Sequence, residues 1–125
     1  MRPAASSRSA GGRATGVPVG DGPMTAMAPE RCETLAELRE AIDALDARLI
    51  GLLAERVRHI DRAVVLKTRE GLPAAIPARV EDVVAKVRAE AARQGFDADL
   101  AEALWRAIID WSIAREEDRL GKSKA

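Results

Sequence analysis

The stretch TLAELREAIDALDARLIGLLAERVRHIDRAVVLKTR (34–69) decides the fold. Thr34 and Glu37 begin it with a Thr-x-x-Glu pattern, which is typical of residues that cap the start of a helix. Apolar residues then recur at steps of three and four, the spacing of one helix face. They are Leu35, Leu38, Ile42, Leu45, Leu49 and Leu52. The pattern predicts one helix over about residues 35–69.

This predicted helix is too long for one small chain to cover. At about 1.5 Å per residue it measures roughly 50 Å. A compact domain of about 100 residues has a radius of gyration of only about 13 Å. The apolar stripe would extend past the core of its own chain, so we expect a second copy of the chain to pack against it.

The remainder of the chain also predicts helices. Residues 70–77 (EGLPAAIP) contain one Gly and two Pro, which indicates a loop. A helix is expected over about 78–93 with Gly95 as its stop. Another is expected from a cap at Asp97 or Asp99 to about 119. Its expected inner stripe follows Leu100, Leu104, Ile108, Trp111 and Arg115. No strand pattern occurs, so we expect an all-α fold with three helices per chain, a long first helix and an intertwined dimeric helical bundle.

The first 30 residues differ from the rest, because they are rich in Gly, Ser, Ala, Pro and Arg and have no apolar period. We expect a disordered N-terminal tail over 1–30, followed by a helical domain over 33–120. An inert tail or misassigned start, a regulatory arm and a targeting peptide all remain open for this segment.

The composition argues against several classes of protein. Twenty basic and 20 acidic side chains balance, which does not suggest nucleic-acid binding. No apolar run approaches the roughly 20 residues that cross a bilayer. A single cysteine, Cys32, cannot form an intrachain disulfide, and a cytoplasmic location is the default. Metal-ligand spacings, phosphate-binding loops and nucleophile–His–Asp sets are missing, so we expect no metal and no cofactor.

Three cations of the first helix are candidates for a binding site. Arg56 interrupts the apolar seam, and Lys67 follows 11 residues later on the same face, roughly 16 Å along the axis. Such a charge needs a partner, which is either an internal acid or a small anionic ligand. Arg39 precedes Lys67 by 28 residues, roughly 42 Å. Only an antiparallel dimer could bring them to one ligand, and alone Arg39 is a solvated charge.

Four further polar residues allow two interpretations each. Ser112 and Glu116 are four apart and share a helix face, either as surface residues or as part of a site. Arg79 stands near a helix N-terminus, where the dipole does not favour a cation, so an anionic partner is indicated. His59, the only histidine, falls in the seam of the first helix, which favours a core or boundary residue over a catalytic one.

The segments LREAID (38–43) and LLAER (52–56), a lysine 11 residues after that arginine and IIDWSIAREE (108–117) together resemble the all-helical chorismate mutases. The resemblance covers about residues 33–120. The Cys32 region, AAIPA (74–78) and IIDW (108–111) resemble a close branch, the isochorismate-pyruvate lyases, whereas Ser112 resembles the mutases.

The resemblance implies a role for each candidate residue. Arg39 would reach into the partner subunit's site and bind one substrate carboxylate, and Arg56 would bind the other. Lys67 and Glu116 would be catalytic at the ether oxygen, a contact that Glu116 donates only when protonated. Arg79 and Ser112 would bind substrate. Val80 and Ile76 depart from the family pattern, at positions where mutases place acids.

The implied reaction is the Claisen rearrangement of chorismate to prephenate, which requires no cofactor and belongs to aromatic amino acid biosynthesis. Catalysis would rest on holding the reactive conformation and on donors aimed at the ether oxygen. A lyase that makes salicylate and pyruvate is the alternative, and a non-catalytic helical dimerisation module is a second. Chorismate, isochorismate and an amino-substituted chorismate all remain open as substrates.

Overall fold

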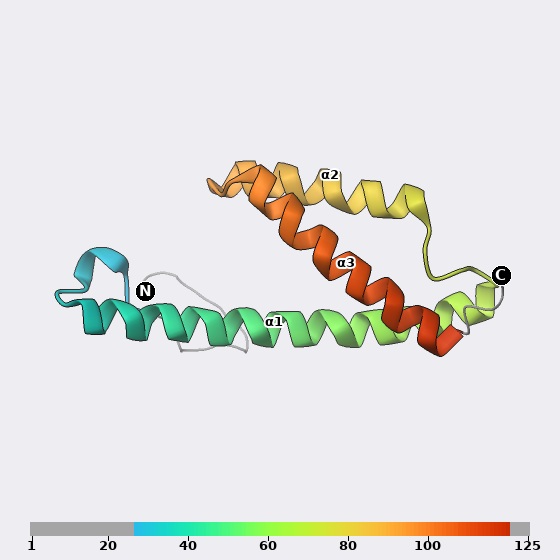
Figure 1. Ribbon diagram of the computed structural model, residues 1–125, viewed down its shortest axis with the longest axis horizontal. Helices are drawn as coiled ribbons and strands as arrows, with labels where there is room; N and C mark the ends of the chain where they lie inside the picture. The colour runs from blue at the N-terminus through green and yellow to red at the C-terminus, as the bar shows by residue number, and fades with distance from the viewer. Residues whose placement is uncertain (1–26, 121–125) are drawn as a thin grey trace, which may run out of the picture. The chain divides into compact units, whose positions relative to one another are not determined.

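The computed structural model describes residues 27–120 and confirms the all-α fold. A short 3-10 helix, η1 (Pro29–Arg31), precedes α1 (Leu35–Glu70), α2 (Pro77–Gln94) and α3 (Ala98–Leu120), as Figure 1 shows. The helix limits lie within about two residues of those predicted. The predicted tail lies outside the described residues except for its last four. The intertwined dimer stays a prediction, because the structure contains one chain.

The chain divides into two units between Ala54 and Glu55, and α1 continues through this boundary. In the first unit, the start of α1 is capped as the sequence predicts. Thr34 Oγ1 accepts a hydrogen bond of 3.1 Å from the amide of Glu37. The Glu37 carboxylate reaches back to the amide of Glu33 at 2.7 Å, one residue before the expected partner. Both bonds satisfy amide groups that the helix itself leaves unpaired.

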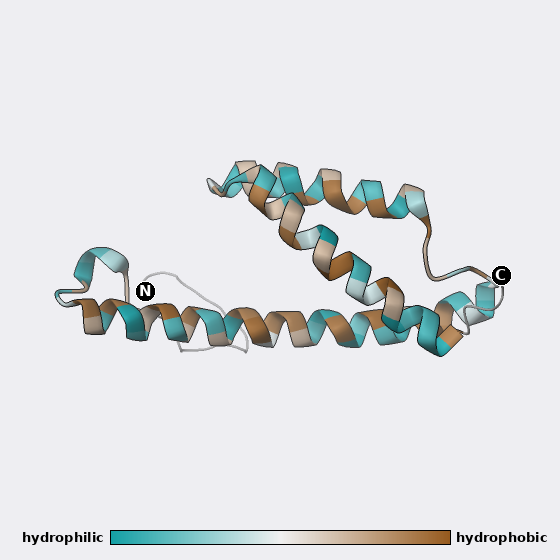
Figure 2. Ribbon diagram, viewed as in Figure 1, coloured by the Kyte–Doolittle hydropathy of each residue, from teal (hydrophilic) through white to brown (hydrophobic). Residues whose placement is uncertain are grey.

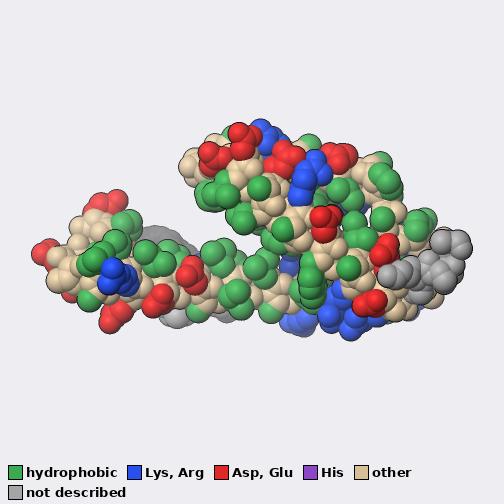
Figure 3. Space-filling model, in the orientation of Figure 1, with side chains coloured by type: hydrophobic (Ala, Val, Ile, Leu, Met, Phe, Trp, Pro, Cys, Tyr) green, Lys and Arg blue, Asp and Glu red, His purple; other side chains and the backbone are tan. Residues whose placement is uncertain are grey.

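The apolar stripe of the first unit stays exposed in the single chain. Leu49 and Leu52 are 57% and 60% exposed, and only Ala41 is buried among the described residues of this unit. Figure 2 shows apolar residues recurring along α1, and Figure 3 shows hydrophobic side chains gathered on its surface. Burying such side chains stabilises by about 2 kcal/mol each, so the stripe favours association with another surface.

The second unit is built on a hairpin of α2 and α3. Gly95 ends α2 with φ 78°, a left-handed conformation that a residue without Cβ adopts at little cost. Asp97 then caps α3, since its Oδ1 accepts the amide of Leu100 at 2.8 Å. The buried side chains of the hairpin are mostly small, which allows the two helices to approach closely. The apolar ones are Val84, Ala91, Ala101 and Ile109.

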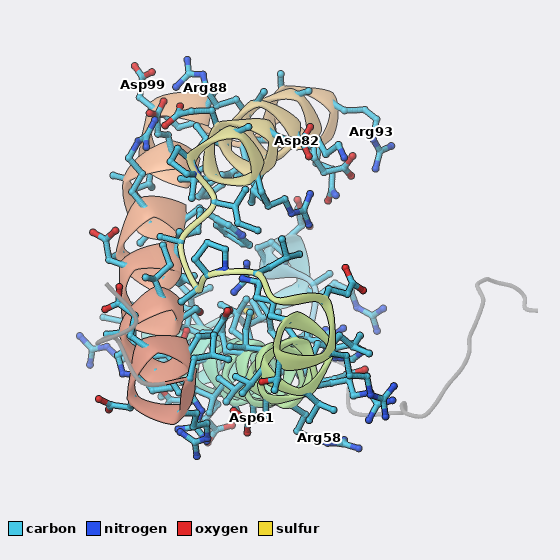
Figure 4. All side chains as sticks on the ribbon, turned by 90° about the vertical axis from the view of Figure 1, so that its right-hand side faces the viewer. Arg58, Asp61, Asp82, Arg88, Arg93 and Asp99 are labelled. Atoms are coloured by element: carbon cyan, nitrogen blue, oxygen red, sulfur yellow. The ribbon has the colours of Figure 1, made fainter. Side chains whose placement is uncertain are left out.

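Ion pairs also hold α2 against α3. Arg88 lies 3.0 Å from Asp99 and 2.8 Å from Glu102, and Figure 4 shows Arg88 and Asp99 side by side. Arg106 pairs with Glu81 at 3.0 Å. These pairs are largely exposed, so each contributes little, but they fix which faces of the two helices meet.

The face of α3 that packs within the chain differs from the expected stripe. The sequence predicts a stripe of Leu100, Leu104, Ile108 and Trp111, yet Leu100, Leu104 and Trp111 are each about half exposed. Ala101, Ile109, Ser112 and Glu116 are buried instead. Because α3 has apolar residues on more than one side, periodicity alone could not choose the inner face. Within residues 27–120, no helix is long and apolar enough to span a membrane.

Gly95→Ala should destabilise the second unit by about 1 kcal/mol, because alanine is strained at positive φ. Gly51→Ala is the matched control. Gly51 lies inside α1 with no atom within 4 Å of an added Cβ, so alanine there should stabilise by about 0.5 kcal/mol. Urea unfolding of the three proteins measures both effects. Equal losses from the two substitutions would contradict the conformational argument.

Candidate active site

A cavity of about 370 Å³ lies in the second unit, within the size range of small-molecule sites. Its lining comes from the later part of α1, the loop before α2, the first turns of α2 and the last turns of α3. The polar side chains at the cavity are Arg56, His59, Lys67, Arg79, Ser112 and Glu116. Five of the six residues that the sequence predicts for the site are therefore brought together.

Lys67 and Glu116 form the central contact of this cavity. Lys67 Nζ lies 2.7 Å from Glu116 Oε1 and donates a second hydrogen bond of 2.7 Å to the carbonyl of Ala74. Glu116 is only 4% exposed and Lys67 is partly buried. A carboxylate at this depth needs a charged partner, which Lys67 supplies. An ammonium group has three N–H bonds, so one remains for a ligand.

Arg56 and Ser112 form a second contact between α1 and α3. Arg56 Nη1 donates to Ser112 Oγ at 3.4 Å, and the buried Ser112 hydroxyl donates to the carbonyl of Ile108 at 2.8 Å. Burial, and then the charge of Arg79, lower the pKa of Arg56 below its usual range. The guanidinium stays protonated all the same. Both causes disfavour its charge, so an anion in the cavity would be attracted to Arg56.

Arg79 faces the cavity from the first turn of α2 and is free to change partner. It is exposed and pairs with Asp82 at 2.7 Å. Asp82 also pairs with Lys86 at 3.1 Å, so it keeps a cation if Arg79 turns to a ligand. The hydrogen bonds from Lys86 and then Arg79 hold the pKa of Asp82 below its usual range.

The charges that line the cavity do not balance. Arg56, Lys67 and Arg79 are cationic, and Glu116 is the one acidic side chain among the lining residues. Cationic side chains therefore outnumber acidic ones in the lining, although Arg79 also pairs with Asp82 outside it. The remaining wall is apolar and includes Ile76, Val80 and Val83. The arrangement suits a small dianion with an apolar body. Within the described residues, no cluster of three or more His, Cys, Asp or Glu side chains could hold a metal.

The structure of one chain leaves the predicted role of Arg39 untested, and it places His59 differently from the sequence analysis. Arg39 lies in the first unit and does not line this cavity. His59, interpreted from its sequence as a core or boundary residue, is exposed and lines the cavity. His59 lies three residues after Arg56 and eight before Lys67. This helical spacing is the feature of the sequence that could have placed His59 at the site.

Asp61 and Arg115 clamp α1 to α3 next to the cavity. Asp61 accepts two hydrogen bonds from Arg115, at 2.6 and 3.1 Å, and the guanidinium also lies 5.4 Å from the centre of the Trp111 ring. The hydrogen bond from Arg115 lowers the pKa of Asp61. Figure 4 shows Asp61 on the face of α1 away from α2. Because Arg115 directly precedes Glu116, this clamp fixes the rotation of α3 that places Glu116 beside Lys67.

Asp61→Asn should lower the melting temperature at neutral pH. A carboxyl whose pKa falls on folding stabilises the protein above its ordinary pKa of 3.8, and this stabilisation is lost as pH falls through the lowered value. The difference in melting temperature from wild type should therefore shrink below about pH 4. Glu90→Gln is the control, because Glu90, with its pKa lowered to about 2, pairs with Arg93 within α2 only. A larger loss from Glu90→Gln would contradict a clamp between helices.

The sequence of this chain is similar to one protein family and to several known proteins. Residues 38–117 match the family chorismate mutase type II. An isochorismate pyruvate lyase of Pseudomonas aeruginosa is 38% identical over 90 residues, 70% of this chain and 86% of the lyase. A T-protein of Enterobacter agglomerans is 35% identical over 85 residues, 68% of this chain and 23% of the T-protein. A T-protein of Haemophilus influenzae is 37% identical over 84 residues, 67% of this chain and 22% of the T-protein. Because the family match covers more than half of the chain, the protein belongs to the chorismate mutase type II family.

Proposed function

We propose that the protein catalyses the rearrangement of chorismate to prephenate in the cavity of the second unit. The observation that carries the proposal is the excess of cationic over acidic side chains in the cavity lining, set against an apolar wall. Chorismate carries one carboxylate on its cyclohexadiene ring and one on its enolpyruvyl side chain, so its charge and its apolar body match the two parts of the site. Arg56 and Arg79, on different helices, are the proposed carboxylate ligands.

Lys67 is the proposed donor to the reacting ether oxygen. In the rearrangement, the ether C–O bond breaks, a C–C bond forms between the enolpyruvyl side chain and the ring, and the ether oxygen becomes the pyruvyl carbonyl. Negative charge develops on this oxygen as the C–O bond lengthens. Two hydrogen bonds already fix Lys67, and its third N–H is available for that oxygen. A donor fixed before the reaction stabilises the transition state without having to reorganise.

Glu116 has two proposed roles that depend on its protonation. As a carboxylate it accepts from Lys67 and holds the ammonium in place, which is the contact in the structure. When protonated, it donates a hydrogen bond and contacts the ether oxygen itself. Ser112 is proposed to bind substrate together with Arg56, since the two side chains are already joined.

Isochorismate-pyruvate lyase is the second candidate, and two observations favour it. The Pseudomonas aeruginosa lyase shares 38% identity over 86% of its own length. Ile76 and Val80 in the lining have no polar side-chain atom, whereas the mutases that the sequence resembles carry acids at these positions. In the lyase reaction a ring hydrogen moves to the enolpyruvyl methylene carbon as the C–O bond breaks, giving salicylate and pyruvate. The same cations would serve this step.

Product analysis separates the candidate functions. The purified protein is incubated with chorismate and, separately, with isochorismate, and products are identified by chromatography and mass spectrometry. Prephenate from chorismate supports the mutase, and salicylate with pyruvate from isochorismate supports the lyase. No product from either would support the non-catalytic dimerisation module. An amino-substituted chorismate is included as a third substrate.

We also propose that the chain works as a homodimer in which Arg39 is donated across subunits. The exposed apolar residues of α1 recur on one face, which suits packing against a second copy of the same helix. An antiparallel pair of α1 helices would place the early turns of one beside the later turns of the other. Arg39 would then serve the cavity of the partner subunit and add a further cation for a carboxylate.

Lys67→Gln should reduce turnover by at least about a hundredfold, because it removes the charge at the ether oxygen. Lys67→Ala should be equally inactive but should also lose about 3 kcal/mol of stability, because it leaves the buried Glu116 without a cation. Glutamine keeps an N–H for Glu116 and is therefore the cleaner variant. Steady-state kinetics and urea unfolding measure the two effects. Wild-type turnover in a folded Lys67→Gln protein would remove Lys67 from the mechanism.

Mixed dimers test the shared site. Arg39→Ala and Lys67→Gln chains, each inactive alone, are co-expressed with different affinity tags. A heterodimer has one cavity in which Lys67 and the donated Arg39 are both intact, so random pairing should recover about a quarter of wild-type activity. If Arg39 serves its own chain, each cavity of the heterodimer lacks one residue and no activity returns. Tandem affinity purification isolates the heterodimer and confirms that it formed.

A further inference from the structure

The cavity supplies many hydrogen-bond donors and few acceptors. Arg56, Lys67 and Arg79 only donate. The Ser112 hydroxyl already donates to Ile108 and accepts from Arg56, and the Ala74 carbonyl accepts from Lys67. Glu116 is buried and directed to Lys67. A hydroxyl group on the ring of a bound dicarboxylate can donate its own proton, and apart from the second oxygen of Glu116 these contacts leave few acceptors for it.

His59 has such an acceptor. Its Nδ1 lies 2.9 Å from the backbone carbonyl of Glu55, one helical turn earlier. A carbonyl oxygen can only accept, so Nδ1 carries the hydrogen in this contact. In the neutral ring, Nε2 then has a lone pair and no hydrogen, and is an acceptor. The hydrogen bond to Glu55 thus selects the tautomer that a hydroxyl donor needs.

The position of His59 suits contact with a ligand held by the cations. It lies three residues after Arg56 on α1, a rise of about 4.5 Å, and before Lys67 on the same side of the helix. The structure includes it in the lining of the cavity, where it is exposed rather than covered. Ile76, Val80 and Val83 in the same lining have no polar side-chain atoms.

We propose that His59 is a specificity residue whose Nε2 accepts the hydrogen bond of the substrate's ring hydroxyl. The proposal rests on the proposed function, since it presumes a hydroxylated cyclohexadiene dicarboxylate in this cavity. Arg56, Lys67 and Arg79 recognise the two carboxylates, which such substrates share. His59 recognises the group whose position differs between chorismate and isochorismate, and so contributes to the choice between them.

The test compares two ligands on three proteins. The first ligand is chorismate or isochorismate, whichever binds the wild type. The second ligand is the analogue of the first without the ring hydroxyl. The proteins are the wild type, His59→Leu, which removes the acceptor, and His59→Gln, which keeps an acceptor oxygen. Affinities are measured at a pH near 8, by titration calorimetry for a ligand that is not turned over and by KM and kcat/KM for one that is, and light scattering records the oligomeric state of each protein.

His59→Leu should weaken binding of the hydroxylated ligand about tenfold, the value of one good hydrogen bond. It should change the affinity for the dehydroxy analogue by less than about twofold, and His59→Gln should recover most of the loss. Arg58→Gln is the matched control. Figure 4 shows Arg58 on the side of α1 away from α2, so it should bind both ligands as the wild type does.

Equal losses for the two ligands, or no loss for either, would overturn the assignment of His59 and indicate a boundary residue of the helix seam. The same experiment separates this outcome from failure of the proposed function. Tight binding of chorismate or isochorismate without turnover contradicts the catalytic proposal, while the comparison with the dehydroxy analogue still decides the role of His59. A wild-type protein that binds neither chorismate nor isochorismate overturns both proposals.

Discussion

The ion pair between Lys67 and Glu116 is the interaction on which the site depends. Glu116 comes from α3, Lys67 comes from α1, and the second hydrogen bond of Lys67 reaches the loop before α2 at Ala74. The end of α1, the loop that follows it and the distant α3 are therefore joined at one ammonium group. Since Glu116 is almost fully buried, separating the pair would leave an uncompensated charge, which is far more costly than breaking a surface ion pair. The contact that holds the elements together is also the contact that orients the proposed donor.

The cavity around this ion pair has more cationic than acidic side chains. Lys67 is neutralised by Glu116, but Arg56 has only a long hydrogen bond to a serine, and Arg79 shares its partner Asp82 with Lys86. Burial, and then the charge of Arg79, disfavour the charged form of Arg56, so keeping this cation at the cavity costs the folded protein some stability. Binding of a dianion would recover that free energy. The arrangement suits a reaction without a covalent intermediate, in which fixed charges select one conformation of a flexible substrate and stabilise its transition state.

The apolar surfaces that the single chain leaves exposed are consistent with the proposed site, to which a second copy of the chain would contribute. Four leucines of the first unit, and three large apolar residues of α3, are about half exposed or more: Leu35, Leu45, Leu49 and Leu52, and Leu100, Leu104 and Trp111. A second copy of the chain would bury apolar side chains of this kind. The charge that Arg39 carries would then have a function that its own chain does not give it. Family membership, the cationic cavity and the uncovered apolar faces thus support one account, in which chemistry and assembly are coupled.

The sequence by itself determined the local structure. The step of three and four from Leu35 to Leu52, the Thr34 cap and the Gly95 stop depend on neighbours a few residues away, so the helix limits could be predicted closely. The helical spacing of Arg56 with Lys67, and of Ser112 with Glu116, placed each pair on one face for the same reason. Only the tertiary structure decided which face of α3 turns inward, because apolar residues surround that helix and the choice rests on packing against α1 and α2. The pairing of Lys67 with Glu116 across 49 residues, the clamp between Asp61 and Arg115 and the place of His59 at the cavity depend on that packing, which no local spacing encodes.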